Sequence, residues 1–134
     1  MPEQSPNPDY FLVGDQGSEL LVLQQAGAGL WGTIYALVGF NAQRTALTGF
    51  AIRGHNETPG LGARMEEPWF RNQFAGKSGP FTTINDEPKD KQTGGSTGNN
   101  EMDAITGATV TTRAVQVMLN QSLLAVEDLA EGTL

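Results

Sequence analysis

Apolar residues in the first half of the chain form short runs that are separated by glycine-rich turns. Residues 10–13 and 19–24 are two such runs around Gly14-Asp-Gln-Gly17, and they predict a hairpin of two strands. The β-branched and aromatic residues of 34–40 and the apolar residues of 45–54 predict two more strands. Because only four residues, 41–44, connect these runs, we expect the two strands to pair antiparallel.

A short helix is predicted after the turn-rich segment that ends near Gly62. Pro68 suits its first turn, the apolar stripe consists of Trp69, Phe70 and Phe74, and Gly76 should end it. A candidate strand at 80–84 and a long polar surface loop at 85–100 follow.

One long helix is predicted from residue 108 to about residue 129. We expect Arg113, Gln116 and Asn120 on its polar face, and its apolar face is predicted to consist of Val110, Ala114, Val117, Met118, Gln121, Leu124 and Ala125. The order of elements predicts an α+β fold, a largely antiparallel sheet with flanking helices in one domain over residues 10–134. Three prolines among residues 1–9 predict a disordered or extended lead-in.

Charge and composition narrow the classes of partner. Fifteen acidic against eight basic residues give a net charge of −7, which argues against nucleic acid or an anionic lipid surface as the main partner. The absence of cysteine excludes disulfides, thiolate chemistry and cysteine-ligated metals, and a single histidine excludes a histidine metal cluster, so we expect no metal site. The longest apolar run, 34–40, is too short to span a bilayer, and the polar, proline-rich start does not resemble a signal peptide.

Several local patterns are decoys. Gly27-Ala-Gly-Leu-Trp-Gly32 matches a dinucleotide fingerprint, but strand rather than helix character follows it. Ala75-Gly-Lys-Ser78 resembles the end of a P-loop, but arginine stands where the first glycine is required. His55 has the neighbours of a turn residue, and we assign no role to the sequons at 56–58 and 120–122.

The stretch 103–112, Asp-Ala-Ile-Thr-Gly-Ala-Thr-Val-Thr-Thr, leads into the long helix. A turn that feeds a helix leaves backbone N–H groups unpaired at the positive end of the dipole, where a phosphate binds favourably. Thr109 lies at this end. The alternative is a threonine-capped helix with nothing bound.

Three stretches together resemble a known family: Gly29-Leu-Trp-Gly-Thr-Ile-Tyr35, Glu57-Thr-Pro-Gly-Leu-Gly62 with the following Glu66-Glu-Pro-Trp-Phe70, and Asp103-Ala-Ile-Thr-Gly-Ala-Thr109. In this order they resemble the FMN-binding domain of bacterial respiratory complexes. The same family includes the C subunit of the Na⁺-translocating NADH:quinone oxidoreductase and the G subunit of the Rnf complex. The likeness covers roughly residues 27–126.

The resemblance implies that Thr109 forms a phosphoester with FMN, which a Mg²⁺-dependent flavin transferase installs from FAD. The resemblance assigns recognition by the transferase to Asp103, Gly107 and Ala108. It also implies that a lysine before the motif contacts the flavin, and Lys91 is the candidate, with Lys89 as the alternative. The other implied flavin contacts are Leu30, Trp31, Glu57, Thr58, Gly60, Leu61, Gly62, Ile105, Thr106, Gly107 and Ala108. Read without the family, Trp31 is equally well a core residue and Pro59-Gly60 is an ordinary type II turn. Read with the family, Thr111 and Thr112 are ordinary first-turn residues without a part in the flavin site.

The resemblance therefore implies an electron-transfer flavoprotein domain, an electron carrier rather than a free-standing enzyme. Its expected partners are the transferase and other subunits of a respiratory or Rnf-type complex. Its expected place is the extracytoplasmic (periplasmic) side of the bacterial inner membrane, with membrane attachment only through a missing anchor or those partners. Two alternatives stay open: an FMN-carrying module of a larger extracytoplasmic flavin reductase, and a flavin-free sensory or structural domain.

Overall fold

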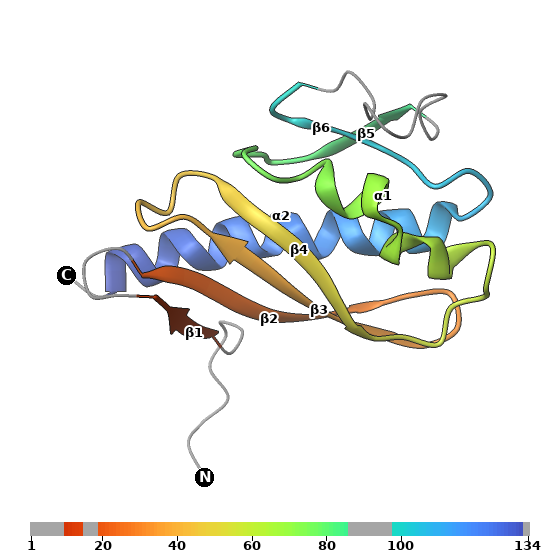
Figure 1. Ribbon diagram of the computed structural model, residues 1–134, viewed down its shortest axis with the longest axis horizontal. Coiled ribbons are helices and arrows are strands. Elements are labelled where there is room, and N and C mark those ends of the chain that lie inside the picture. Colours follow the sequence, from red (N-terminus) through yellow and green to blue (C-terminus); the bar gives the residue numbers. More distant parts are fainter. Residues whose placement is uncertain (1–9, 15–18, 86–97, 133–134) are drawn as a thin grey trace, which may run out of the picture.

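The fold is built on one antiparallel sheet of four strands, seen in the computed structural model, which describes residues 10–14, 19–85 and 98–132 (Figure 1). In spatial order the strands are β1 (Tyr10–Val13), β2 (Leu20–Ala28), β3 (Thr33–Phe40) and β4 (Leu47–Gly54). The four predicted strands and the antiparallel pairing of β3 with β4 are confirmed. Strand β2 continues past the predicted end at residue 24, because residues 25–28 pair with residues 33–36 of β3.

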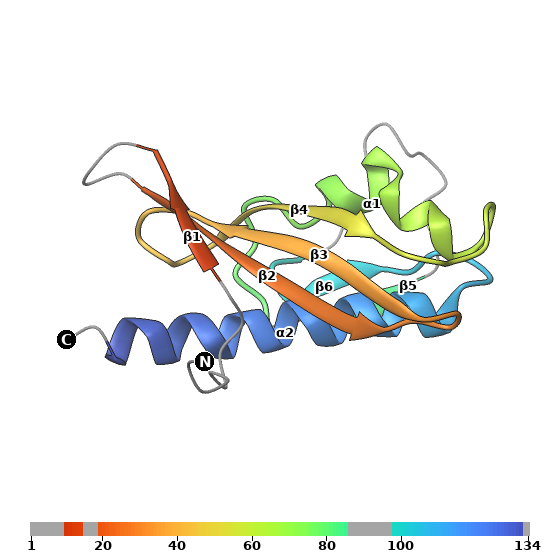
Figure 2. The same ribbon diagram turned by 90° about the horizontal axis from the view of Figure 1, so that it is seen from below.

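The long helix α2 (Thr109–Gly132) crosses one face of this sheet, so that sheet and helix form two layers (Figures 1 and 2). Alternate residues of β2 and β3 point toward the helix and are buried, as the period of two in a strand requires. These inner-face residues are Leu21, Leu23, Ile34, Ala36, Val38 and Phe40. The predicted α+β architecture is confirmed.

The predicted apolar face of α2 is partly wrong. Val110, Val117 and Leu124 are 47%, 44% and 63% exposed, whereas Val115 and Leu119 are fully buried. Ala114, Met118 and Ala125 of the predicted face are buried, as expected, and the buried side of α2 continues from them through Val115 and Leu119. Gly27 and Gln25 of β2 contact Met118 and Ser122 on this side. Helical periodicity finds the apolar residues but does not say how far around the helix the rest of the fold covers them.

A second, smaller layer follows β4. It contains the 3₁₀ helix η1 (Gly62–Glu66), the helix α1 (Pro68–Asn72), and a parallel pair of strands, β5 (Thr82–Asn85) and β6 (Glu101–Asp103). The predicted short helix and the strand near 80–84 are confirmed, but α1 ends before Gly76, and neither η1 nor β6 was predicted. Edge-to-face ring contacts with centroids 5.5–5.6 Å apart link this layer to β4, and the rings are Phe50, Phe70, Phe74 and Phe81.

Amide side chains fix the segments that lead into the stretch 103–112. Asn120 of α2 accepts from the N–H of Phe81 (2.7 Å) and donates to its carbonyl (3.0 Å), and the Gln116 Oε1 atom accepts from the Thr83 N–H at 3.1 Å. Gln73 forms the same two-bond pattern with the backbone of Asp103, at 2.7 and 3.1 Å. Gln116 and Asn120 are thus on the polar side of α2, where their amides hold the second layer on the helix.

No helix in the described parts of the chain combines the length and the apolar character that a membrane span needs.

Candidate functional site

Thr109 begins α2 at the point where the loop after β2, the segment 57–62 and the turn 105–108 come together. Two cavities meet here, and both include Gly107 and Thr109 in their walls. The first has a volume of about 360 Å³ and is lined by Leu30, Trp31, Glu57, Thr58, Leu61, Gly62, Gly107, Ala108, Thr109, Val110 and Thr111. The second, of about 330 Å³, is lined by Thr82, Thr83, Ala104, Ile105, Gly107, Thr109, Thr112, Arg113 and Gln116.

The first cavity has an apolar and open rim. Leu30, Trp31, Leu61 and Val110 all line it, and their exposed fractions lie between 46% and 64%. Trp31 is the most exposed of them, so the alternative of a core tryptophan is wrong. Exposed apolar side chains gathered around a cavity are typical of a ligand site, and a flat aromatic ring system fits such walls.

Glu57 ties three segments of this cavity together. Its Oε2 atom accepts from the Trp31 N–H at 3.0 Å, and its Oε1 atom accepts from the Leu30 N–H at 3.0 Å and from the Thr111 hydroxyl. The carboxylate therefore joins the loop after β2 and the first turn of α2 to its own segment. Only 5% of Glu57 is exposed, so these bonds replace solvation by water.

The electrostatics of Glu57 reflect these contacts. Burial raises the pKa of the Glu57 carboxyl, but the hydrogen bonds from Thr111, Trp31 and Leu30, with His55 nearby, outweigh burial and place that pKa below its ordinary value. Glu57 is thus a carboxylate whose negative charge is held by protein donors.

The geometry of the Glu57-Thr-Pro-Gly-Leu-Gly62 segment explains its glycines. Leu61 N–H donates to the Thr58 carbonyl at 3.0 Å, and Gly60 has a φ of +81°, which is the type II turn expected for Pro59-Gly60. A Cβ atom on Gly62 would lie 2.5 Å from the Thr111 hydroxyl oxygen and 2.9 Å from the Glu57 Cβ atom. Only glycine at position 62 leaves room for the bond between Glu57 and Thr111.

The four threonines of the motif differ in what their hydroxyls do. Thr111 and Thr112 are buried: the Thr111 hydroxyl donates to Glu57, while the Thr112 hydroxyl donates to the Ala108 carbonyl at 2.8 Å and accepts from the Ile105 N–H at 3.1 Å. Thr106 is exposed and lines neither cavity. The Thr109 side chain is exposed, lines both cavities and makes no hydrogen bond within the described parts of the chain.

The backbone around Thr109 provides further donors. The Thr112 N–H donates to the Ala108 carbonyl at 3.0 Å and is the first bond of the helical ladder. The N–H groups of residues 109–111 precede that bond, so they belong to the end of the helix that the ladder does not satisfy. Donors at this end, together with the helix dipole, favour an anion next to the Thr109 hydroxyl.

The second cavity is more polar. Thr82, Thr83 and Gln116 line it together with Arg113, whose exposed guanidinium has no hydrogen-bond or ion-pair partner among the residues that the structure describes. A cation and several hydroxyls beside Thr109 extend the anion-binding character of the helix end.

Most of the predicted site residues come together here. The first cavity contains Leu30, Trp31, Glu57, Thr58, Leu61, Gly62, Gly107, Ala108 and Thr109, and the second contains Ile105. Gly60 and Thr106 line neither cavity. Asp103 is only 3% exposed, and Lys89 and Lys91 lie outside the described residues.

Sequence reasoning missed Val110, Arg113 and the roles of Thr111 and Thr112, which are not ordinary first-turn residues because both are buried and bonded. The helical period carried a signal for Thr111. Three consecutive helix residues point in different directions, so Val110, Thr111 and Thr112 had to meet different neighbours. Helical geometry alone does not say which neighbours these are.

Comparison with known proteins identifies the family of the chain. The family described as the FMN-binding domain matches residues 29–124. The C subunit of the Na⁺-translocating NADH-quinone reductase from Yersinia pestis is 33% identical over 115 residues, which cover 83% of this chain and 42% of that protein. The G subunit of the Na⁺-translocating ferredoxin:NAD⁺ oxidoreductase complex from Acetobacterium woodii is 36% identical over 104 residues, covering 78% of this chain and 47% of that protein. The chain thus spans less than half the length of these relatives.

Solved structures give the same result. The crystal structure of the C subunit of the Na⁺-translocating NADH-quinone reductase from Parabacteroides distasonis superposes with a TM-score of 0.68 at 29% identity, covering 87% of this chain and 59% of that one. NqrC from Shewanella oneidensis has the same fold, with a TM-score of 0.74 at 23% identity over 92% of this chain and 60% of that one. The family match over residues 29–124 and the shared fold show that the chain belongs to the FMN-binding domain family.

Proposed function

We propose that this chain is an electron-transfer flavoprotein domain that carries FMN through a phosphoester bond to Thr109. The observation that carries this proposal is the state of the Thr109 hydroxyl. It is the exposed threonine hydroxyl at the junction of the two cavities, whereas the Thr111 and Thr112 hydroxyls are buried and engaged. A group attached at Thr109 can reach into both cavities without breaking a protein hydrogen bond.

The residues around Thr109 fit the parts of FMN. The apolar rim formed by Trp31, Leu61 and Val110 suits the faces of the isoalloxazine ring system. The N–H groups of the first turn of α2 and the Arg113 side chain suit the phosphate. Bound FMN would supply the redox chemistry, since flavins transfer electrons and the protein contributes binding, orientation and electrostatics.

The protein's own contribution to electron transfer is the environment of the flavin. Glu57 places a negative charge behind the apolar wall, and the walls exclude part of the water from the ring. For a one-electron couple, roughly 59 mV corresponds to a tenfold change in the equilibrium constant. A substitution of Glu57 should therefore be measurable as a shift in the midpoint potential of the bound flavin.

We further propose that FMN is installed from FAD by a Mg²⁺-dependent flavin transferase, which reaches the exposed Gly107 and Thr109 directly. Asp103 and Ala108 stay predicted recognition residues; Asp103 is buried, and Gln73 fixes its backbone N–H and carbonyl. A contact from Lys91, or from Lys89, stays a prediction. We propose that the domain works on the extracytoplasmic side of a membrane with other subunits of an Nqr-type or Rnf-type complex, since both relatives named above are subunits of such complexes.

The attachment is tested by coexpression with a flavin transferase, followed by intact mass and in-gel flavin fluorescence after denaturation. We expect the wild-type mass to rise by FMN less one water, and Thr109→Val to show neither the increment nor the fluorescence. Thr48→Val is the matched control, because Thr48 is an exposed threonine of β4 outside the motif and outside both cavities, and it should still be labelled. A dark wild-type band, or a fluorescent Thr109→Val band, would refute the covalent link.

A further inference from the structure

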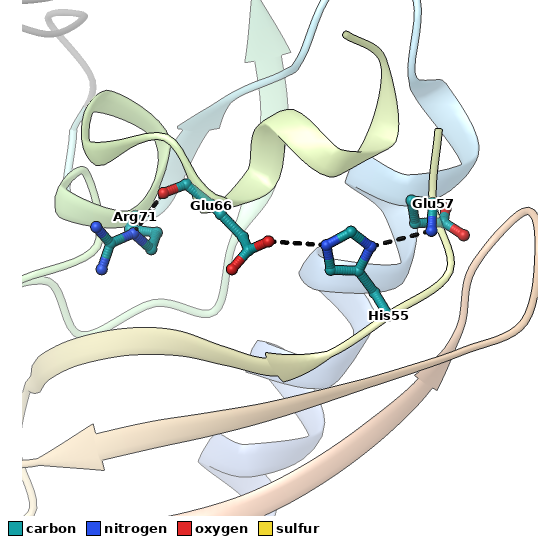
Figure 3. Close-up of polar contacts among 4 residues, drawn as sticks. All are labelled: His55, Glu57, Glu66 and Arg71. Carbon is teal, nitrogen blue, oxygen red and sulfur yellow. Dashed lines mark hydrogen bonds and ion pairs between the residues drawn. The ribbon is translucent and has the colours of Figure 1, made fainter. Parts of the chain in front are cut away.

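His55, the chain's single histidine, lies directly behind Glu57 (Figure 3). Its Nδ1 atom accepts a hydrogen bond from the Glu57 backbone N–H at 3.0 Å, and its Nε2 atom lies 2.8 Å from the Glu66 Oε2 atom. A backbone N–H can only donate, so Nδ1 must be unprotonated and Nε2 must carry the proton that it donates to Glu66. With 14% of its side chain exposed, the imidazole is held between the two partners.

We propose that His55 is a positioning residue for the cavity, which holds the Glu57 backbone in place as long as its imidazole is neutral and releases it on protonation. The contact from residue 55 to the N–H of residue 57 has the pattern of an Asx-turn, here made by a ring nitrogen. This role was not visible in the sequence, where His55 had only the neighbours of a turn residue.

Protonation changes one contact and keeps the other. An imidazolium ring carries an N–H at both nitrogens, so Nδ1–H would face the Glu57 N–H, and two donors would oppose each other. The bond from Nε2 to Glu66 would remain and gain charge. Histidine is the side chain that usually changes its charge between about pH 5 and 8, so pH is the variable that tests this contact.

The charged groups around the ring are carboxylates and an arginine. The Glu66 carboxylate faces the ring at Nε2, and the Glu57 backbone N–H faces it at Nδ1. Arg71 lies beyond Glu66, where its Nε atom donates to the Glu66 carbonyl at 2.8 Å (Figure 3). The Glu57 carboxylate is near the ring but is bonded to Leu30, Trp31 and Thr111. Arg64 is paired with Glu67 at 3.3 Å on the same small layer. A proton on Nδ1 would therefore keep the contact with Glu66 and oppose the backbone donor of Glu57.

A displacement of the Glu57 backbone reaches the cavity wall. The Glu57 carboxylate holds the Leu30 and Trp31 amides and the Thr111 hydroxyl, so a shift of residue 57 changes all three contacts. The consequence for a bound flavin rests on the proposed function. The coupling from His55 to the wall does not, because every contact in it is within the protein.

The first test uses flavin-free, ¹⁵N-labelled protein in NMR. The ring nitrogens should show the Nε2–H tautomer at neutral pH, and the amide signals of Glu57, Leu30 and Trp31 should move in one step together with the ring as pH falls. Because the chain has one histidine, the ring titration is assigned without ambiguity. An Nδ1–H tautomer, or a Glu57 amide that ignores the ring titration, would overturn the proposal.

Two variants separate positioning from general stability. In H55A the Glu57 amide should exchange with deuterium about tenfold faster at constant pH, because a hydrogen bond contributes at most about 1.5 kcal/mol and 1.4 kcal/mol is tenfold. In H55N the Asn carbonyl can accept from the same N–H, so slow exchange should return while the titration step disappears. Equal exchange in both variants would contradict the proposal. Should H55A fail to fold, the wild-type tautomer and titration decide alone.

A second arm uses flavin-loaded protein. We expect the midpoint potential of wild-type FMN to follow the ring titration and that of H55N to lack this step. If no flavin binds, the proposed function fails, but the NMR result stands by itself. If flavin binds and the amide signals do not titrate, the positioning role fails and the proposed function stands.

Discussion

Glu57→Gln is the sharpest perturbation of the site, because it preserves shape and removes one acceptor. In the wild type both carboxylate oxygens accept hydrogen bonds: Oε1 from Leu30 and Thr111, and Oε2 from Trp31. A glutamine offers one oxygen and one NH₂ group. In either orientation of the amide, at least one protein donor loses its acceptor and faces another donor.

The magnitude follows from the number of contacts. A hydrogen bond to a charged group contributes about 1.5–3 kcal/mol, and a buried donor left unpaired adds to the cost, so we expect Glu57→Gln to lower the free energy of unfolding by about 2–4 kcal/mol. This is a large part of the roughly 5–15 kcal/mol that stabilises a typical domain. With a urea slope of about 2 kcal/mol per M, the midpoint of unfolding should fall by about 1–2 M.

The assay is equilibrium urea unfolding of flavin-free protein, followed by far-UV circular dichroism at pH 7. Thr111→Val removes one of the donors without changing the volume much, and Thr111→Ser, which keeps a hydroxyl, is its control. Because Glu57 and Thr111 are bonded directly, the double variant should lose less than the sum of the single variants, with a coupling of about 1 kcal/mol or more.

Two results would contradict this expectation. A Glu57→Gln midpoint within about 0.2 M of the wild type would show that the carboxylate does not hold the three segments. Strictly additive effects of Glu57→Gln and Thr111→Val would show that the bond between them contributes nothing to stability.

Three further outcomes are expected. The pKa of Glu57 in the folded state is lowered from its ordinary value of 4.5. The stability that the Glu57 carboxylate contributes is therefore present above pH 4.5 and is lost as pH falls through the lowered folded-state pKa. The urea midpoints of wild type and Glu57→Gln should converge under acid. Gly62→Ala should lower stability by about 1–3 kcal/mol, measured by thermal unfolding, because the new Cβ would overlap Thr111. Trp31→Ala should change stability by less than about 0.5 kcal/mol, since its side chain is 64% exposed, yet it should alter the absorption spectrum of bound flavin; a large loss of stability would place Trp31 in the core instead.

Strong periodic patterns made part of the fold predictable. The apolar runs of β2, β3 and β4 are long enough, and their turns short enough, that sheet and pairing follow from local rules. Strand β6 has only three residues, and a long connection in the sequence separates it from its partner β5, so no local pattern predicts the pair. The predicted face of α2 is partly wrong for a different reason. Its apolar residues cover a wide arc, and only the rest of the fold decides that Val115 and Leu119 are buried while Val110, Val117 and Leu124 stay exposed.

The site divides in the same way. The position of Thr109 at the start of α2 was predictable, because a turn that enters a helix marks its first residue, while its attachment role stays a prediction. The bond between Thr111 and Glu57 joins positions 54 residues apart, and the contact of His55 depends on which of its ring nitrogens faces the backbone. Such pairings depend on the whole fold, so local patterns in a single sequence do not predict them.

The geometry separates residues that hold the site from residues that are free to bind. Glu57 and Thr111 have their polar atoms bonded within the protein, whereas the Thr109 hydroxyl makes no such bond in the described parts of the chain and Trp31 presents an exposed ring. The sequence motifs contain residues of both kinds, and the sequence alone does not distinguish them. Loss of flavin in a Glu57 or Thr111 variant would therefore not identify a flavin contact, because the same change loosens the cavity wall. Only a variant that loses flavin while its unfolding midpoint stays unchanged, as we expect for Thr109→Val, identifies a residue that acts on the cofactor itself.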